Sequence, residues 1–427
     1  MTHRAALILF GSLCCASLHA QSPTLLVDVY ASARAVSVES QPSWIEGGFG
    51  RLGLGADDAG DTSTDILGDL RFGFEWRPVE QFAVVANGVA RAEPSGFRGD
   101  SAGLVEGYLE GRFATLDPSP HQSSGRLRLR LGTFFLPTSR ENVEPLWTTP
   151  YTITFSAINS WIGEEVRPTG LDADYRLDLP SGQSLALAAT MFGGNDTMGT
   201  LLAWRGWSMH NRLTVYDEVL PLPPLFSFED SGPFWRQRDD GTKPFGSDLD
   251  DTEGWSARAR WEIPDRTLVQ YTHLDNRGDR MLYKGEYSWA TEFDLVGVEY
   301  HPTIDTTFAG EYLSGSAGMG PVFQVQADIE AWYLLASRRF GRWRVTGRYD
   351  DFSTTDRDHE PTTESNDDDG RAWTVAAFWD ATPSIRLGAE YLDLRADRPA
   401  ALQSGFDPDT DGRTLAVELR YYWGVTR

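Results

Sequence analysis

The amino-acid sequence predicts an all-β fold, a transmembrane antiparallel β-barrel of about 18 strands, with about 16 strands as the alternative. Apolar and charged residues alternate with a period of two in segment after segment. Short and long connections alternate between these segments. After the first twenty residues, no apolar run approaches the ~20 residues of a membrane-spanning helix. A soluble β-sandwich, which turns its apolar faces inward, is the competing fold for the same pattern.

Residues 1–20 are predicted to be a cleaved signal peptide, and residues 21–427 the barrel. The basic Arg4 precedes an apolar stretch and a region of small residues, as in secretory leaders. Both cysteines, Cys14 and Cys15, lie in this segment. The mature chain therefore contains no cysteine for a disulfide or a metal site. A secreted barrel of this kind is expected in the cell outer membrane.

The charge of the chain excludes one class of partner. There are 62 Asp and Glu against 38 Lys and Arg, a formal net charge of −24. A phosphate backbone requires a basic surface, so we expect no nucleic acid. The expected partners are outer-membrane lipids, the barrel-assembly machinery and small solutes.

The alternation is plainest in the last segment, where apolar residues recur from Leu415 to Trp423 while Glu418 and Arg420 face the other way. The highly charged polar faces favour a wet lumen over the surface of a sandwich. Aromatic residues at segment ends are candidates for the interfacial girdles of a membrane barrel. They are Trp76, Phe135, Trp261, Trp343, Tyr391 and Trp423.

The connections give the strand count. Turn residues mark short connections near 77–80, 117–124, 180–182, 205–206, 263–265, 302–305, 340–342 and 381–384. Counting strands between them gives about 18, with both ends on the short-turn side. The alternative of 16 applies if the weak segment at 198–217 is one strand, or if the first segment pairs differently. With 16 or more strands, wall side chains no longer fill the interior, and an aqueous channel is expected.

The connection at 137–165 is long, aromatic and mixed in charge. A loop of this length usually has a function. We expect it to fold into the lumen and narrow it; the alternative is an ordinary surface loop. The candidate constriction residues are Arg140, Glu141, Glu144, Trp147, Tyr151 and Trp161.

Arginines recur on the polar faces of several segments, and rings or ladders of such charge select anions. The alternative is that they pair with lumen carboxylates and stiffen the wall. The candidate pore-lining residues are Arg126, Arg128, Arg130, Arg258, Arg260, Arg344, Arg348, Glu106 and Glu110.

One acidic motif has the spacing of a calcium loop. Asp407, Asp409 and Asp411 alternate before Gly412, and Glu418 follows. Flanking helices are not predicted, and Glu418 belongs to the final strand. We therefore favour an acidic extracellular turn, with calcium binding as the alternative, and expect no other cofactor.

The run from Arg126 to Pro137, the Glu141-Asn142 pair and the stretch from Val166 to Gly170 resemble the phosphate-selective (O/P-type) porin family. In that family, a strand ending in a Gly-aromatic-Pro stretch leads into the constriction loop. The resemblance implies an outer-membrane porin, a water-filled channel for passive diffusion of small hydrophilic or ionic solutes. It also allows anion selectivity and a homotrimer. The family's best-known members use lysine-rich anion sites, so the resemblance does not extend to phosphate in a chain with two lysines, Lys243 and Lys284.

Two other functions stay open. A structural or plugged barrel without transport requires the 137–165 loop to close the lumen. An outer-membrane hydrolase requires a histidine beside a nucleophile, and His210 lies near Ser208, but the sequence holds no Gly-x-Ser-x-Gly motif. We expect no enzymatic activity.

Overall fold

Sixteen antiparallel strands close into a barrel in the computed structural model, which describes residues 23–56, 61–93, 96–116, 123–237, 241–246, 248–358 and 364–424. Each strand pairs with its neighbours in chain order, and the first pairs with the last, so that Val29 lies opposite Trp423. Closure of this kind leaves no free sheet edge. The predicted signal peptide and most of the predicted turn at 117–124 lie outside the described residues.

The barrel strands are β1 (Thr24–Ser40), β2 (Thr62–Val79), β3 (Phe82–Ala92), β4 (Ala102–Leu116), β5 (Ser124–Thr133), β6 (Thr169–Asp178), β7 (Ser184–Gly193), β8 (Glu253–Ile263), β9 (Thr267–Asp275), β12 (Ala290–Thr303), β13 (Thr306–Met319), β14 (Val325–Phe340), β15 (Trp343–Asp356), β16 (Asp368–Asp380), β17 (Ile385–Asp397) and β18 (Gly412–Trp423). A separate hairpin joins β10 (Leu282–Tyr283) to β11 (Glu286–Tyr287). The helices are α2 (Ala157–Glu165) and α3 (Thr200–Trp204), with 3-10 turns at Trp44–Glu46, Pro145–Trp147, Phe226–Phe228 and Pro399–Ser404. None of the helices in the described part of the chain has the length and apolarity needed to cross a membrane.

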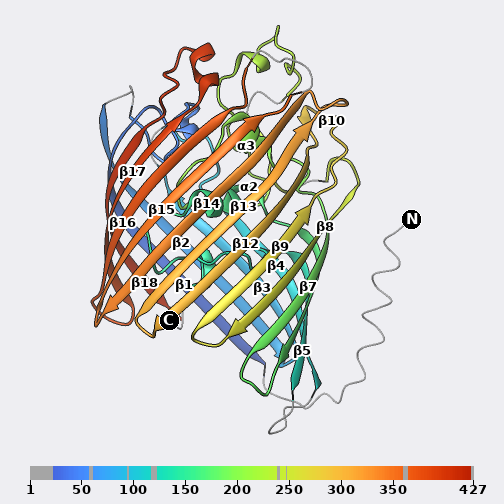
Figure 1. The fold of residues 1–427 in the computed structure, drawn as a ribbon, viewed down its shortest axis with the longest axis vertical. Helices are drawn as coiled ribbons and strands as arrows, with labels where there is room; N and C mark the ends of the chain where they lie inside the picture. The colour runs from blue at the N-terminus through green and yellow to red at the C-terminus, as the bar shows by residue number, and fades with distance from the viewer. Residues whose placement is uncertain are drawn as a thin grey trace.

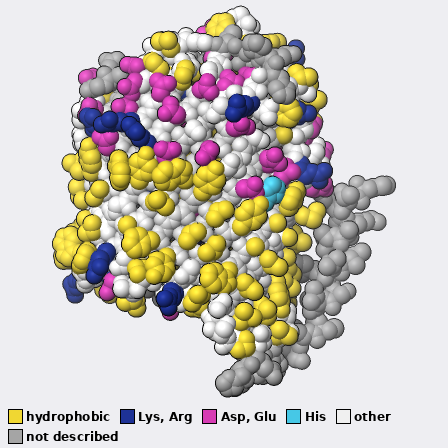
Figure 2. Space-filling model, viewed as in Figure 1, with side chains coloured by type: hydrophobic (Ala, Val, Ile, Leu, Met, Phe, Trp, Pro, Cys, Tyr) yellow, Lys and Arg dark blue, Asp and Glu magenta, His cyan; other side chains and the backbone are white. Residues whose placement is uncertain are grey.

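The two faces of the wall follow the alternation in the sequence. On β2, Phe72 and Phe74 are exposed on the outer surface, whereas Asp69 and Arg71 are buried inside. Apolar side chains cover the outer wall on the face shown in Figure 2, and charged residues gather beyond them toward the loops. This arrangement is that of a barrel whose outer wall faces lipid, because burial in a sandwich would reverse the two faces.

Five of the six aromatics proposed for the interfacial girdles are exposed, and one is not. The outer-wall aromatics are exposed: Trp76, Trp261, Trp343, Tyr391 and Trp423. Phe135 was wrongly included, because β5 ends at Thr133 and the chain then turns into the barrel. The Phe135 ring is buried there and stacks on Trp147, with ring centroids 4.0 Å apart.

The strand count of about 18 is wrong, and the alternative of 16 is confirmed. Residues 198–217 add no barrel strand: α3 occupies part of them and the rest is irregular. Leu201, Trp207 and Met209 are all buried, so this segment has no lipid-facing side. Its alternation reflects packing on both sides inside the barrel, and the expected turn at 205–206 lies within this inner segment.

Connections differ at the two ends of the barrel. Short turns join β2 to β3, β14 to β15 and β16 to β17 at one end, and β18 ends there too (Figure 1). Long connections gather at the other end, while α2 and α3 lie within the ring of strands (Figure 1). The lumen is therefore occupied by chain from the long connections, and any function of the pore depends on how these segments are held.

Candidate functional site

The segment 137–165 crosses the inside of the barrel. It leaves the wall after β5, and every residue of α2 is buried. The Ser156 hydroxyl caps this helix by accepting a hydrogen bond from Asn159 N at 3.2 Å. In the ring of 16 strands, β15 is the eighth strand from β5 in both directions and therefore lies opposite it. Contacts between this segment and β15 therefore span the lumen.

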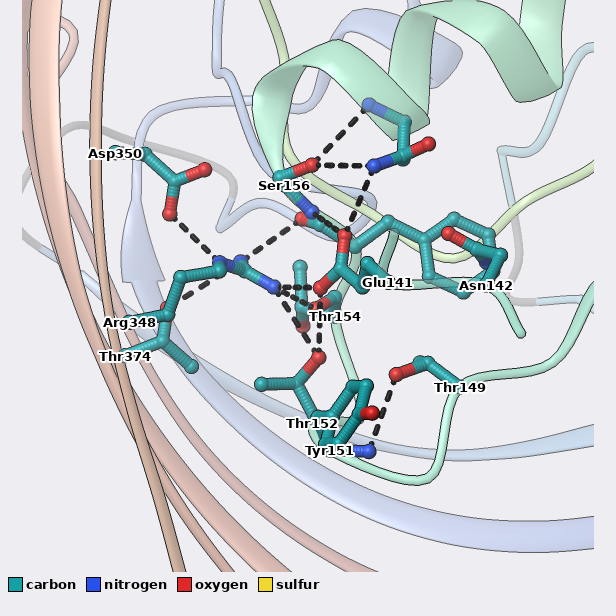
Figure 3. A network of polar contacts seen from close by, with 12 residues as sticks. Glu141, Asn142, Thr149, Tyr151, Thr152, Thr154, Ser156, Arg348, Asp350 and Thr374 are labelled. Atoms are coloured by element: carbon teal, nitrogen blue, oxygen red, sulfur yellow. Dashed lines mark hydrogen bonds and ion pairs between the residues drawn. The ribbon is translucent and has the colours of Figure 1, made fainter. Parts of the chain in front are cut away.

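Arg348 on β15 is the centre of the largest of these contacts (Figure 3). Its guanidinium pairs with Glu141 of the segment and with Asp350 on its own strand, the latter at 2.7 Å. It also donates to the carbonyls of Thr154 at 2.8 Å and Phe155 at 3.0 Å. The side chains of Arg348, Glu141 and Asp350 are fully buried. One wall arginine thus binds both the charge and the backbone of the inner segment.

Other wall side chains hold the same segment from several directions. Glu390 on β17 accepts hydrogen bonds from the backbone of Ile153 (2.5 Å) and Thr154 (3.0 Å). Arg420 on β18 donates to the carbonyls of Thr149 (2.7 Å) and Thr152 (2.9 Å). Arg71 on β2 donates to the carbonyls of Leu146 and Trp147, and Gln270 on β9 donates to the carbonyl of Pro137. Glu311 on β13 accepts hydrogen bonds from Asn159 Nδ2 and Arg140 N. Such contacts satisfy buried backbone groups that a loop cannot pair internally.

A second inner segment, residues 194–252, packs against α2. Arg205 forms a two-pronged ion pair with Glu164, both bonds at 2.8 Å, and His210 Nε2 lies 2.7 Å from the same carboxylate. Burial raises the pKa of Glu164, but Arg205 and His210 outweigh it and lower that pKa to about 2. The ring of Trp44 lies against the Arg205 guanidinium at 4.3 Å. His210 Nδ1 accepts from Arg212 N, so both ring nitrogens are engaged without a serine hydroxyl.

The neighbouring Glu165 has a different environment. Its carboxylate accepts hydrogen bonds from Trp161 Nε1 at 2.7 Å and from the backbone of Gly199 and Leu201, both at 3.0 Å. Within the described residues, no ion pair reaches it. Burial is the main cause that raises the pKa of Glu165 to about 7, against the lowering effect of these bonds. The pKa values of these two adjacent carboxylates therefore differ widely, because only Glu164 is paired with cationic side chains.

Large apolar side chains pack between the two inner segments. Trp161 meets Trp207 and Phe293 edge to face, with ring centroids 6.0 Å and 5.4 Å apart. Trp161 and Trp207 are almost completely buried, as are Leu201 and Leu202. The upper lumen is therefore packed like a protein core, and free space lies beside the segments.

Most predicted pore-lining arginines point inward and are paired. Arg126 pairs with Asp178 at 2.7 Å, Arg128 with Asp174 at 3.4 Å, and Arg130 with Asp172 at 2.9 Å. Arg258 binds the other oxygen of Asp172. The side-chain exposure falls along this ladder from 62% at Arg126 through 35% at Arg128 to 6% at Arg130. These four arginines and Arg348 are thus paired with carboxylates, which is the alternative to free charges that select anions.

The remaining pore-lining candidates divide into two groups. Glu110 pairs with Arg77 at 3.1 Å and Arg112 at 2.6 Å, and Glu106 accepts from Asn87 at 2.7 Å and Phe135 N at 2.8 Å. In contrast, Arg260, Arg344 and the loop residue Arg140 make no ion pair with any described residue. Within the described residues, the Arg140 guanidinium donates only to the carbonyls of Thr138 and Pro137, at 3.3 Å and 3.4 Å. These three guanidinium groups thus lack a directly paired carboxylate among the described residues, although Asp174 and Glu262 act on Arg260 and Arg140 acts on Glu311 electrostatically.

Open space lies beside the 137–165 segment. A pocket of about 340 Å³ is lined by Glu106, Phe135, Arg140, Val143 and Trp147. A smaller one of about 90 Å³ is lined by residues that include Arg34, Asp69, Arg91, Glu93, His210 and Arg212. Of the other constriction candidates, Glu144 pairs with Arg386 at 3.6 Å, and Tyr151 is buried against Arg344, whose guanidinium lies 5.3 Å from its ring. The predicted loop residues therefore line free space and bind the wall.

The calcium motif is not brought together. Asp409 and Asp411 donate from their backbones to the preceding carboxylates, Asp407 Oδ1 at 3.0 Å and Asp409 Oδ1 at 3.2 Å. Glu418 lies inside the barrel on β18, where it pairs with Arg420. A strand residue with an inward side chain cannot close a loop of alternating carboxylates. Calcium binding at this motif is thus not supported by the placement of Glu418.

Two contributions to the site were not predicted: Arg205, and His210 as a partner of Glu164. Both residues belong to the segment 198–217, which was assigned to the wall. The only signal was the density of Trp, Leu and Met on both faces of that segment.

Comparison with known proteins supports the architecture. No protein-family model matches the chain, and no curated protein matches it either. The outer membrane channel DcaP of Acinetobacter baumannii is similar in structure, with 9% identity, a TM-score of 0.52, and coverage of 95% of this chain and 99% of that chain. The anion-selective porin from Comamonas acidovorans (9% identity, TM-score 0.48, 94% and 100% covered) and OmpT of Vibrio cholerae (9%, 0.48, 96% and 100%) are also similar.

The closed 16-strand barrel, its apolar outer wall and the likeness to DcaP define the class of this protein: it is an outer-membrane β-barrel with a porin-like fold.

Proposed function

We propose that this chain is a porin through which small hydrophilic or ionic solutes diffuse passively, with a preference for anions. The observation that carries the proposal is the set of three inner arginines, Arg140, Arg260 and Arg344, that form no ion pair with any described carboxylate. Guanidinium groups of this kind attract anions and repel cations where the path is narrow. The description of DcaP as a channel is consistent with a conducting barrel.

The position of Arg140 makes it the main selectivity residue. It lies on the inner segment and lines the pocket of about 340 Å³, next to Glu106 and Trp147. Arg260 lines a small adjoining space of about 10 Å³ that Pro137 also lines. The lower ladder of Arg126, Arg128 and Arg130 is matched by aspartates and contributes little net charge. Selectivity is therefore expected beside the inner segment, not along the ladder.

Planar-bilayer recording across a salt gradient tests this proposal. The refolded mature chain should give steady conductance steps and an anion-selective reversal potential. The double variant Arg140→Gln/Arg260→Gln should move that potential toward zero. Arg126→Gln is the matched control, because Asp178 keeps Arg176 as a partner at 2.8 Å when Arg126 is lost. A cation-selective wild type, or equal shifts in both variants, would contradict the assignment.

A plugged barrel is the second candidate, favoured by the packing of Trp161 and Trp207 in the upper lumen. Well-folded protein without any conductance would support it in place of the porin. The finer properties implied by the family resemblance belong to the same proposal: phosphate as a solute, insertion by the barrel-assembly machinery and a homotrimer. The ratio of phosphate to chloride permeability tests phosphate as a solute. The native mass in detergent tests the homotrimer.

A further inference from the structure

Three carboxylates converge where residues 194–252 leave and rejoin the wall. Asp196 follows β7 by three residues, and Asp248 and Asp250 stand shortly before β8. One carboxylate oxygen from each lies within 4.8 Å of those of the other two. No described Lys, Arg or His forms an ion pair with any of them. Three like charges at this spacing repel one another unless a proton or a cation intervenes.

Asp196 provides a second and separate observation. The residue is only 2% exposed, and its Oδ1 is buried without any hydrogen-bond partner. Its Oδ2 accepts one bond, from Leu249 N at 2.5 Å. A buried carboxylate oxygen without a partner is unfavourable unless a ligand occupies the space before it.

The surroundings favour a hard divalent cation. Every donor atom is a carboxylate oxygen, the type that Ca²⁺ takes at about 2.3–2.6 Å, so that one ion can bridge oxygens up to about 5 Å apart. Asp248 is exposed and leaves one side open for the water molecules that complete a shell of about 6–8 ligands. Asp250 is already positioned by Asp279 N at 2.8 Å and Ser288 Oγ at 2.7 Å. The oxygens are thus held by the scaffold before any ion binds.

We propose that Asp196, Asp248 and Asp250 form a Ca²⁺ site that fastens the base of the 194–252 segment. The ion would join the start of the segment to its end and, through Asp250, to the connection that carries β10 and β11. The site lies at the long-loop end of the barrel, away from the three unpaired arginines. It is independent of conduction, because it concerns the anchoring of the segment that carries Arg205 and His210.

Calorimetric titration of the full chain in detergent, stripped with EDTA and then given CaCl₂ alone, tests the site. We expect one Ca²⁺ per chain, weaker binding of Mg²⁺, and at least a tenfold loss of affinity in Asp248→Asn. Asp196→Asn should behave in the same way. Asp409→Asn, in the acidic turn, is the matched control and should bind like the wild type. Absence of binding at millimolar Ca²⁺, or binding that Asp248→Asn leaves unchanged, would overturn the proposal.

Folding and seating of the segment can be followed separately. A heat-modifiable gel shift shows whether each variant forms the barrel, and Asp248→Asn changes only an exposed side chain, so its barrel is expected to form. Hydrogen exchange of peptides within 194–252 should slow on addition of Ca²⁺ in the wild type and not in Asp248→Asn. Equal exchange with and without Ca²⁺ in the wild type would contradict the fastening role.

Discussion

Replacement of Arg348 by Met tests how the inner segment is held. The change removes the guanidinium while keeping most of the side-chain volume, and leaves Glu141 and Asp350 buried without their cation. Breaking a fully buried ion pair on one side costs about 3–5 kcal/mol. Two hydrogen bonds to the carbonyls of Thr154 and Phe155 are lost as well.

At about 1.4 kcal/mol for each tenfold change, this cost makes local opening of residues 137–165 roughly 100- to 4,000-fold more frequent. Hydrogen exchange of peptides from this segment, measured in detergent, reports that ratio directly. Arg348→Lys keeps the charge but loses the forked geometry, and should fall between Met and the wild type. In bilayers, the Arg348→Met channel should close frequently, because residues 137–165 detach from the wall more often.

Arg126→Met is the matched control for this series. Its ion pair with Asp178 is 2.7 Å long but largely exposed, so the expected effect is below about 1 kcal/mol. If exchange of 137–165 in Arg348→Met stays within fivefold of the wild type, the segment is held mainly by its other anchors, and our reasoning about Arg348 is wrong.

Three further predictions concern titration, packing and closure of the wall. Because the pKa of Glu165 is raised to about 7, its contribution to stability is complete below pH 4.5 and is lost as the pH rises through about 7. Exchange in 194–217, corrected for its intrinsic pH dependence, should therefore speed up between pH 5 and 8 in the wild type and change less in Glu165→Gln. Trp161→Ala should destabilise the seated segment by about 3–5 kcal/mol and raise conductance, whereas the lipid-facing Trp343→Ala should leave conductance unchanged. Gly132→Ala would place a Cβ 2.3 Å from the carbonyl oxygen of Gly107 at a φ of +139°, so the refolded fraction in a heat-modifiable gel should fall; Gly347→Ala, which meets nothing within 4 Å, should refold normally.

The wall could be predicted from sequence because its signal is local. A period of two identifies a strand and its lipid-facing side within about ten residues, and this placed Leu415 outside and Glu418 inside correctly. The same rule failed at 198–217, since a segment buried on every side can also alternate. Period alone does not distinguish a strand facing lipid from a chain packed inside a barrel.

The inner site could not be predicted for a different reason. Glu141 and Arg348 are 207 positions apart, and Ile153 and Glu390 are 237 apart. Such pairs form because β15 and β17 face β5 across a closed ring, a relation that depends on the total strand count. With 18 strands in place of 16, a different strand would lie opposite β5. The wall residues that contact the 137–165 segment would then differ as well. The loop could be recognised from its length and composition, but its partners could not.

We infer two separate roles for the charged inner face. The buried backbone groups of a loop need protein partners, and the wall provides them here: Arg348 and Arg420 donate to loop carbonyls, while Glu390 accepts from loop amides. These charges are therefore required for seating the segment, whatever the solute. Arg140 and Arg260 are different, because no described carboxylate pairs with them. Substitutions in the first group should change exchange and gating, whereas those in the second should change reversal potential alone.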